Sequence, residues 1–401
     1  MKTAHIKSYL KSFAPHLQIA FTFILIHFAL SYLATKLIPY SGIFSYPETI
    51  DNLPYPDFLK RLASFDGAHY LKIAQDGYER NSPAFFPLYP ILTRLLSQLI
   101  GTSFFLSSII ITFLSFTYFL YFLNKLLQKL GLSQRDKKWV QILTLTFPTS
   151  FFFIASYTES LFMMLMSMSL YFLAASKRVP LLISGFFLPL TRFVGLFLII
   201  PIYLISLKEC LTLSKKNYRL IVKNLFRKAL SFNILTVVLG FITYSTFLYI
   251  YKDDALAFFN SQKDFGMGRQ TDLILFPQVI YRYLKILFTA DLSFQYIVAL
   301  IELSVFLFVG LILILEAKNL IKRKDYVSLR AGLLLFSIIN IILPTFTGTF
   351  ASIPRYALSS ISVFIYLSQI KSNSLKFLIA FIFAMLHIFL FMHFIQGYFV
   401  S

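Results

Sequence analysis

The sequence predicts an all-α, polytopic membrane protein that forms a single membrane-embedded domain over residues 1–401. Three observations lead to this fold class. First, 58% of the 401 residues are hydrophobic and only 13% are charged, whereas soluble domains carry about 25% charged residues. Second, several apolar runs, such as "LQIAFTFILIHFALSYLA" at 17–34, approach or reach the length of a spanning helix. Third, basic and acidic residues gather in different loops between these runs.

Taken in order, the apolar runs predict about eleven membrane segments. One stretch, 179–207, is interrupted by "PLTR" and counts as two segments, a broken hairpin that enters the membrane and returns. Residues 86–101 carry two prolines and Arg94 and are short for a span, so we expect an interfacial or re-entrant helix there. The remaining nine segments are expected at 17–37, 104–123, 139–156, 159–176, 229–251, 293–316, 328–346, 356–370 and 375–396.

The loop charges predict how the chain is oriented. Basic residues of membrane proteins collect in cytoplasmic loops, and 23 of the 37 Lys and Arg lie in 1–16, 124–138, 177–178, 208–228, 318–324 and 371–376. Segments 38–85 and 252–291 hold 11 of the 17 acidic residues and are expected outside. The N-terminus is then inside, the C-terminus outside, and the first extracytoplasmic loop covers about 38–103 and carries interfacial helices. The absence of eukaryotic signals favours a prokaryotic inner membrane.

Composition and missing motifs exclude several functions. The net charge of +20 follows from the cytoplasmic loops and does not indicate a nucleic-acid partner. Cys210 is the single cysteine, so an intrachain disulfide and a cysteine zinc site are excluded. The sequence has no phosphate-binding loop, dinucleotide fingerprint, metalloprotease pair or nucleophile elbow. We therefore expect no cofactor and no metal.

The first outward loop concentrates polar residues in "SFDGAHYLKIAQDGYERNSPAFFPLYP" (64–90). If 57–76 is one helix, His69 lies on a stripe with Phe58, Leu62 and Phe65, and Asp66 shares the adjacent stripe with Tyr70. Such a helix would lie on the membrane and present Asp66 at the water–lipid boundary. A general base is needed there if one substrate is a lipid phosphate and the other a hydroxyl. The alternative is that Asp66 is a solvated loop residue.

Three further charged residues lie at the outer ends of apolar runs. Glu159 lies in "FPTSFFFIASYTESLF", Arg192 in "LPLTRFVG" and Arg355 in "SIPRYALSS". Charges in membrane segments are costly and normally face a cavity or a partner. Either the two arginines pair with Glu159 structurally, or they bind a phosphate through forked hydrogen bonds. Arg269, in the glycine-containing loop "DFGMGRQTD", is a third candidate for phosphate binding.

These segments together resemble a known family. "FDGAHYLKIAQDGY…AFFPLYP" (65–90) is similar to the signature of the second GPI mannosyltransferase (PIG-V) and its prokaryotic relatives. "FPTSFFFIASYTESLF" (147–162), "LTRFVG" (190–195) and "PRYALS" (354–359) agree in order and kind. One departure is Phe65, where the family pattern has Trp before the Asp.

The resemblance implies a GT-C-type glycosyltransferase that takes a sugar, typically mannose, from a polyprenyl-phosphate donor on the extracytoplasmic face. The acceptor implied is a glycolipid, a polysaccharide or a protein. Asp66 would be the catalytic base of an inverting displacement. Donor phosphate would be bound by Arg355, Arg192 and Arg269, and the sugar or acceptor by His69, Tyr78, Glu79 and Glu159.

The alternative function is a transporter or flippase of lipid-linked saccharides. A transporter of this kind should show internal repeats and polar residues at the middle of the membrane. The sequence shows no clear repeat, and its polar residues gather toward one face. This distribution favours the enzyme.

Overall fold

The computed structural model describes residues 2–79, 82–213, 231–261, 270 and 272–400. Within these ranges all regular elements are helical, which confirms the predicted all-α class. Six helical segments of this part are long and apolar enough to cross a membrane: α1 (Lys2–Leu37), α6 (Phe104–Lys129), Phe193–Leu211, α12 (Phe232–Lys252), α15 (Phe294–Lys322) and α19 (Asn373–Ile395). The protein is therefore an integral, multi-pass membrane protein.

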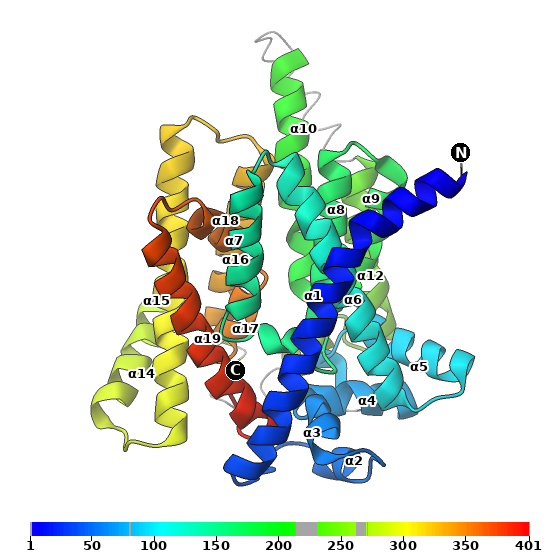
Figure 1. Ribbon diagram of the computed structural model, residues 1–401, viewed down its shortest axis with the longest axis vertical. Coiled ribbons are helices and arrows are strands. Elements are labelled where there is room, and N and C mark those ends of the chain that lie inside the picture. Colours follow the sequence, from blue (N-terminus) through cyan, green and yellow to red (C-terminus); the bar gives the residue numbers. More distant parts are fainter. Residues whose placement is uncertain (1, 80–81, 214–230, 262–269, 271, 401) are drawn as a thin grey trace.

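Shorter helices stand between the long ones (Figure 1): α7 (Gln134–Thr146), α8 (Glu159–Ala174), α9 (Arg178–Phe187), α16 (Leu329–Thr345) and α18 (Ile361–Ser368). Helix α10 (Ile199–Leu213) forms most of the long segment Phe193–Leu211. Proline sets several of their ends, because it lacks the backbone donor of a helix and keeps the preceding residue extended. Helix α7 stops before Pro148, and Pro344 lies in the last turn of α16. The expected hairpin at 179–207 consists of two helical arms, α9 and α10, separated by the 3-10 segments η4 (Leu188–Leu190) and η5 (Phe193–Leu198). The count of eleven membrane segments stays a prediction.

Several short elements gather at the end of the molecule away from the N-terminus (Figure 1): α2 (Pro47–Asp51), α3 (Asp57–Lys60), η1 (Arg61–Ala63), α4 (Asp66–Asp76), η2 (Ser82–Ala84) and α5 (Leu88–Ile100). Helix α5 occupies the segment expected to be interfacial. Its 13 residues reach only about 20 Å, and it buries Tyr89, Thr93 and Ser97 while exposing Leu95 and Leu99. Length and amphipathic pattern both fit a helix that lies in the membrane interface.

The remaining short elements are η3 (Ser150–Phe153), α13 (Ala257–Asn260), α14 (Phe276–Thr289) and α17 (Ile353–Ala357). A serine caps the N-terminus of five of the helices. In each, the serine hydroxyl accepts a hydrogen bond from the backbone N–H three residues further on, which satisfies one of the free donors of the first turn. The capping residues are Ser103, Ser133, Ser293, Ser328 and Ser372.

The segment that follows α19 returns to the first loop. The Gln396 carbonyl accepts from the Ser41 backbone N–H at 2.8 Å, and its side-chain oxygen accepts from Arg61 at 2.8 Å. Gly397 has φ +76°, and a Cβ there would lie 2.6 Å from the Gly42 backbone nitrogen. Glycine is required at 397 by this approach and by its backbone conformation. Residues 396–400 are thereby held against the loop that carries Asp66.

Candidate active site

A cavity of about 670 Å³ lies among the helix ends, and four of its lining residues carry formal charge in one connected group. These are Asp66, Glu159, Arg192 and Arg355, which come from four separate segments of the chain. His69 lines the same cavity. Aromatic rings form much of the remaining wall, including those of Phe65, Tyr157, Tyr356 and Phe399.

Asp66 is placed by a break in the chain. The single helix expected over 57–76 is wrong, because α3 and η1 end at Ala63 and α4 begins only at Asp66. Between them, Phe65 has φ 58° and ψ −121°, a conformation that costs a residue with a side chain about 1–3 kcal/mol. Its ring packs against Phe44, Phe394 and Phe399 at centroid distances of 4.9, 5.7 and 6.0 Å. Tertiary packing therefore overrides the helical pattern.

The break gives Asp66 the first position of α4, where the helix dipole favours a carboxylate. Hydrogen bonds from a neighbouring segment fix the turn before Asp66. The Tyr157 hydroxyl donates to the Ser64 carbonyl at 2.9 Å. The Ser156 backbone N–H donates to the Leu62 carbonyl at 3.0 Å. The stretch that precedes Glu159 thus holds the stretch that precedes Asp66.

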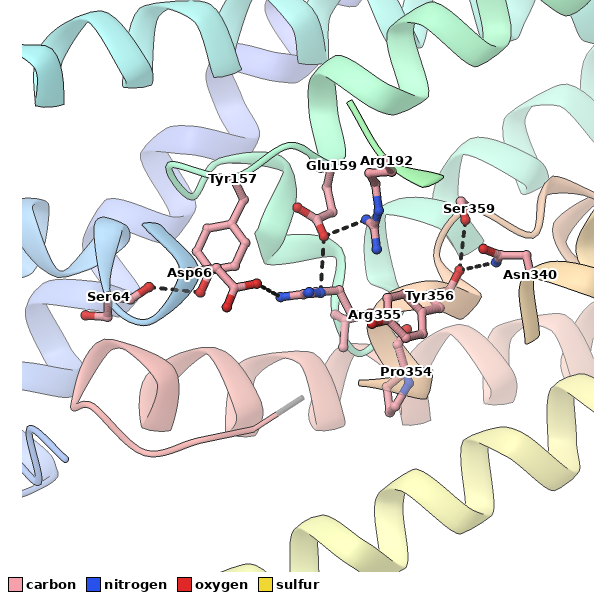
Figure 2. Close-up of polar contacts among 11 residues, drawn as sticks. Ser64, Asp66, Tyr157, Glu159, Arg192, Asn340, Pro354, Arg355, Tyr356 and Ser359 are labelled. Carbon is pink, nitrogen blue, oxygen red and sulfur yellow. Dashed lines mark hydrogen bonds and ion pairs between the residues drawn. The ribbon is translucent and has the colours of Figure 1, made fainter. Parts of the chain in front are cut away.

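Arg355 lies in α17, next to the loop that leaves α16. Two contacts hold its neighbours: Thr149 donates to the Pro354 carbonyl at 2.8 Å, and Asn340 donates to the Tyr356 carbonyl at 2.6 Å. Arg355 Nη1 donates to Asp66 Oδ2 at 2.6 Å, and its Nε lies 3.2 Å from Glu159 Oε1. The guanidinium therefore bridges two carboxylates (Figure 2).

Glu159 is the first residue of α8 and is only 3% exposed. Its Oε1 also accepts from Arg192 Nη1 at 2.7 Å. Its Oε2 is buried and has no hydrogen-bond partner within the described residues. Figure 2 shows the resulting sequence of charges, Asp66–Arg355–Glu159–Arg192, in which acids and bases alternate. Both interpretations of Arg192 and Arg355 stay open, since residues that pair with Glu159 also face the cavity.

Electrostatics keep Arg355 charged. Burial alone lowers the pKa of Arg355, but the carboxylates of Asp66 and then Glu159 outweigh burial and hold this pKa well above its ordinary value. Burial raises the pKa of Tyr157 well above the usual value for tyrosine, so its hydroxyl remains a hydrogen-bond donor at neutral pH. Burial also lowers the pKa of His69, against the opposing attraction of Asp66.

The lowered pKa leaves His69 neutral at pH 7, and its ring packs between aromatic rings. It stacks on Phe85 at 4.5 Å and meets the edge of Tyr46 at 5.0 Å. Because it lies one turn after Asp66 on α4, it faces the same cavity. Its ring therefore forms part of the cavity wall.

The other predicted site residues are placed elsewhere. Tyr78 donates to the Phe85 carbonyl at 2.7 Å, and Glu79 forms an ion pair with Lys72 at 3.2 Å. Neither lines the cavity. Arg269 lies outside the described residues.

Sequence reasoning missed several wall residues. Tyr157 and Tyr356 adjoin predicted site residues, and their place in the same short motifs could have indicated them. Phe399 and Asp272 had no such signal. Within the part of the chain that the structure describes, no three His, Cys, Asp or Glu side chains gather closely enough to hold a metal ion.

The fold and the site define a multi-pass membrane protein with a partly open, largely apolar cavity that holds a group of charged side chains. The profile of the family described as Mannosyltransferase (PIG-V) matches residues 10–283, which is more than half of the chain. The chain belongs to this mannosyltransferase (PIG-V) family. The match confirms the family that the sequence resemblance indicated.

Two solved structures are similar in fold, both of the Archaeoglobus fulgidus oligosaccharyltransferase. The apo form gives a TM-score of 0.44 at 13% identity and covers 95% of this chain and 56% of that one. The form tethered through a disulfide bond to an acceptor peptide containing the NVT sequon gives 0.42 at 13% identity, over 94% and 55%. This chain thus spans about half the length of those proteins. A search of curated proteins finds no match.

Proposed function

We propose that this protein transfers a sugar, mannose, from a polyprenyl-phosphate donor to an acceptor hydroxyl on the extracytoplasmic face, with Asp66 as the general base. The observation that carries the proposal is the contact between Asp66 and Arg355 at 2.6 Å inside the cavity. It puts a carboxylate and a phosphate-binding guanidinium side by side. An acceptor hydroxyl and a lipid phosphate need these two groups at adjacent positions.

The reaction is a single inverting displacement. The acceptor oxygen attacks the anomeric carbon while Asp66 takes the proton of the hydroxyl. The bond from the anomeric carbon to the phosphate oxygen breaks, and its electron pair stays on the lipid phosphate. Arg355 and Arg192 stabilise the charge that develops there, since guanidinium groups bind phosphate through paired hydrogen bonds.

The ion pair between Asp66 and Arg355 also sets the order of events: the donor binds before the base becomes active. A carboxylate that is paired with arginine is a weaker base than a free one. An incoming donor phosphate competes with Asp66 for the Arg355 guanidinium, while the Glu159 contacts keep both arginines at the cavity. Donor binding then releases Asp66 and makes it basic enough to activate the acceptor. The enzyme therefore activates its base only when a donor is in place.

The proposed sidedness rests on charge. The cavity lies beside α4, in the loop whose acidic residues contrast with the basic segments on the side of the N-terminus. Acceptors in this location are glycolipids, polysaccharides or proteins outside the cytoplasm, in a prokaryotic inner membrane.

The test is transfer of label from radiolabelled polyprenyl-phosphate mannose in membranes that contain the wild type, Asp66→Asn or Asp76→Asn. Asp76 ends the same helix and is exposed, so it is the matched control. Asparagine keeps the shape of the side chain but cannot take the proton. Transfer by the wild type and by Asp76→Asn, with loss in Asp66→Asn, supports the proposal. Equal transfer by all three proteins rules out Asp66 as the base.

A further inference from the structure

A second, smaller cavity lies between α6 and α7, toward the end of the molecule that carries the N-terminus (Figure 1). Its volume is about 50 Å³. Cavities that hold one water have roughly 10–15 Å³ by this kind of measure, so the space fits a group of about the size of phosphate. The cavity is separate from the catalytic one and shares no lining residue with it.

The two helices contribute very different walls. Four residues of α7 recur at the spacing of one helical face, and all four are polar: Gln134, Lys137, Lys138 and Gln141. The facing stripe of α6 has the same spacing and is apolar apart from one amide: Leu120, Leu123, Asn124 and Leu127. A polar helix face normally turns to water. Here Gln134 and Lys138 are exposed as expected, but Lys137 is buried beside a membrane helix across a small space.

Positive charge in this space is not balanced. Lys137 is only 7% exposed, and within the described residues no carboxylate lies at ion-pair distance from it. Lys125 lies close enough for its charge to act on Lys137. The one acidic residue of α7, Asp136, is turned elsewhere: it accepts from Ser133 at 2.7 Å, and its charge acts on Lys376.

The same cavity borders a hydrogen-bond donor that is not used. Gln141 Nε2 is buried and has no hydrogen-bond partner within the described part of the chain. An unpaired buried donor costs about 1–3 kcal/mol in ordinary proteins. The unbalanced lysine and the unused amide border one space, so a single bound anion would satisfy both.

We propose that this cavity binds the phosphate of an anionic phospholipid headgroup from the leaflet at this end of the molecule. Lys137 and Lys138 supply the charge, Gln141 supplies a neutral donor, and the leucines of α6 contact the adjoining carbon atoms of the lipid. Basic pockets between membrane helices on the cytoplasmic side bind headgroups in this way. Bound lipid would contact both α6 and α7. Helix α7 ends three residues before Thr149, whose hydroxyl donates to the carbonyl of Pro354, the neighbour of Arg355.

The experiment measures the thermal stability of the full chain in nanodiscs of phosphatidylcholine, with or without phosphatidylglycerol. The quantity compared is the rise in Tm caused by phosphatidylglycerol, so an intrinsic effect of a mutation on Tm cancels. The variants are Lys137→Gln and Gln141→Leu. Lys322→Gln is the matched control, since Lys322 is an exposed lysine at the end of α15.

We expect phosphatidylglycerol to raise the Tm of the wild type and of Lys322→Gln by the same amount. Lys137→Gln should lose more than half of this rise, and Gln141→Leu should lose part of it. A full rise in both cavity variants overturns the proposal. A third arm adds inorganic phosphate to phosphatidylcholine discs: an equal rise there, lost in Lys137→Gln, identifies free phosphate as the ligand and overturns the lipid source.

Discussion

Arg192 and Arg355 share one oxygen of Glu159, at 2.7 and 3.2 Å, although the two arginines lie in separate segments of the chain. Two cations this close would repel each other strongly in a buried site without the carboxylate between them. Glu159 is thus the residue that allows two guanidinium groups to face one cavity. A site that must stabilise a phosphate leaving group needs such a concentration of positive charge.

Replacing Glu159 with Gln is expected to destabilise the protein by about 3 kcal/mol, because it removes the shared charge from a buried pair of arginines. Thermal unfolding in detergent measures the effect, with the exposed Glu48→Gln as the control. The double variant Glu159→Gln/Arg192→Gln should lose less than the sum of the single variants. Strict additivity would mean that Glu159 and Arg192 are not coupled.

The proposed exchange of Arg355 predicts a particular pH dependence. The acid limb of kcat/KM for the donor reports the base in the free enzyme, and that of kcat reports the base in the donor complex. Because a paired guanidinium stabilises the ionised form of a carboxylate, the proposal predicts that the limb of kcat/KM lies at the lower pH. In Arg355→Gln we expect the rate to fall about 10²–10³-fold and the two limbs to coincide. Limbs that stay apart in this variant contradict the exchange.

Phe399 is expected to act on the reaction through Phe65. Its ring lines the cavity and packs at 6.0 Å from the ring that precedes Asp66. Phe399→Ala should lower kcat roughly tenfold with little change in KM, since small displacements of a reacting group are costly. Tyr398→Ala is the control, because Tyr398 packs on Phe294 and His393 instead. Similar losses of kcat in both variants would indicate a general effect of the segment.

His69 predicts how stability changes with pH. Burial lowers its pKa in the folded protein below 6.5, so the unfolded chain takes up the proton at a higher pH than the folded protein does. Its contribution to stability is therefore complete above about pH 6.5 and declines as the pH falls toward the folded-state pKa, by about 1.4 kcal/mol for each unit between the two values. His69→Phe keeps the stacking and removes the proton site. Melting curves from about pH 7.5 to about pH 5.5 should decline less steeply for this variant than for the wild type.

Much of the fold could be predicted because a membrane helix is encoded locally, by its apolar length and by the charges that flank it. The ends of α8 and α16 lie within two residues of their predicted positions. The break at Phe65 could not be predicted, since rings from distant segments impose its positive φ.

For the site too, the residues could be predicted from local sequence, but their contacts could not. Asp66, Glu159, Arg192 and Arg355 could be selected individually as charges beside apolar runs, and the structure brings them to one cavity. Which atoms meet depends on tertiary contacts: 289 residues separate Asp66 from Arg355. Tyr78 and Glu79 belong to the motif that resembles the family but do not line the cavity. This could not be predicted, because a sequence motif does not reveal which of its side chains point inward.

The return of residues 396–400 to the first loop has a consequence for biosynthesis. Those residues leave the ribosome after every described membrane helix, and their contacts with Ser41 and Arg61 can form only once α19 is in place. Until then the cavity lacks the wall that Phe399 provides. Under the proposed function, a nascent chain in which α4 has formed but residues 396–400 have not docked would be an incomplete enzyme, and competence would arise in one late step of assembly.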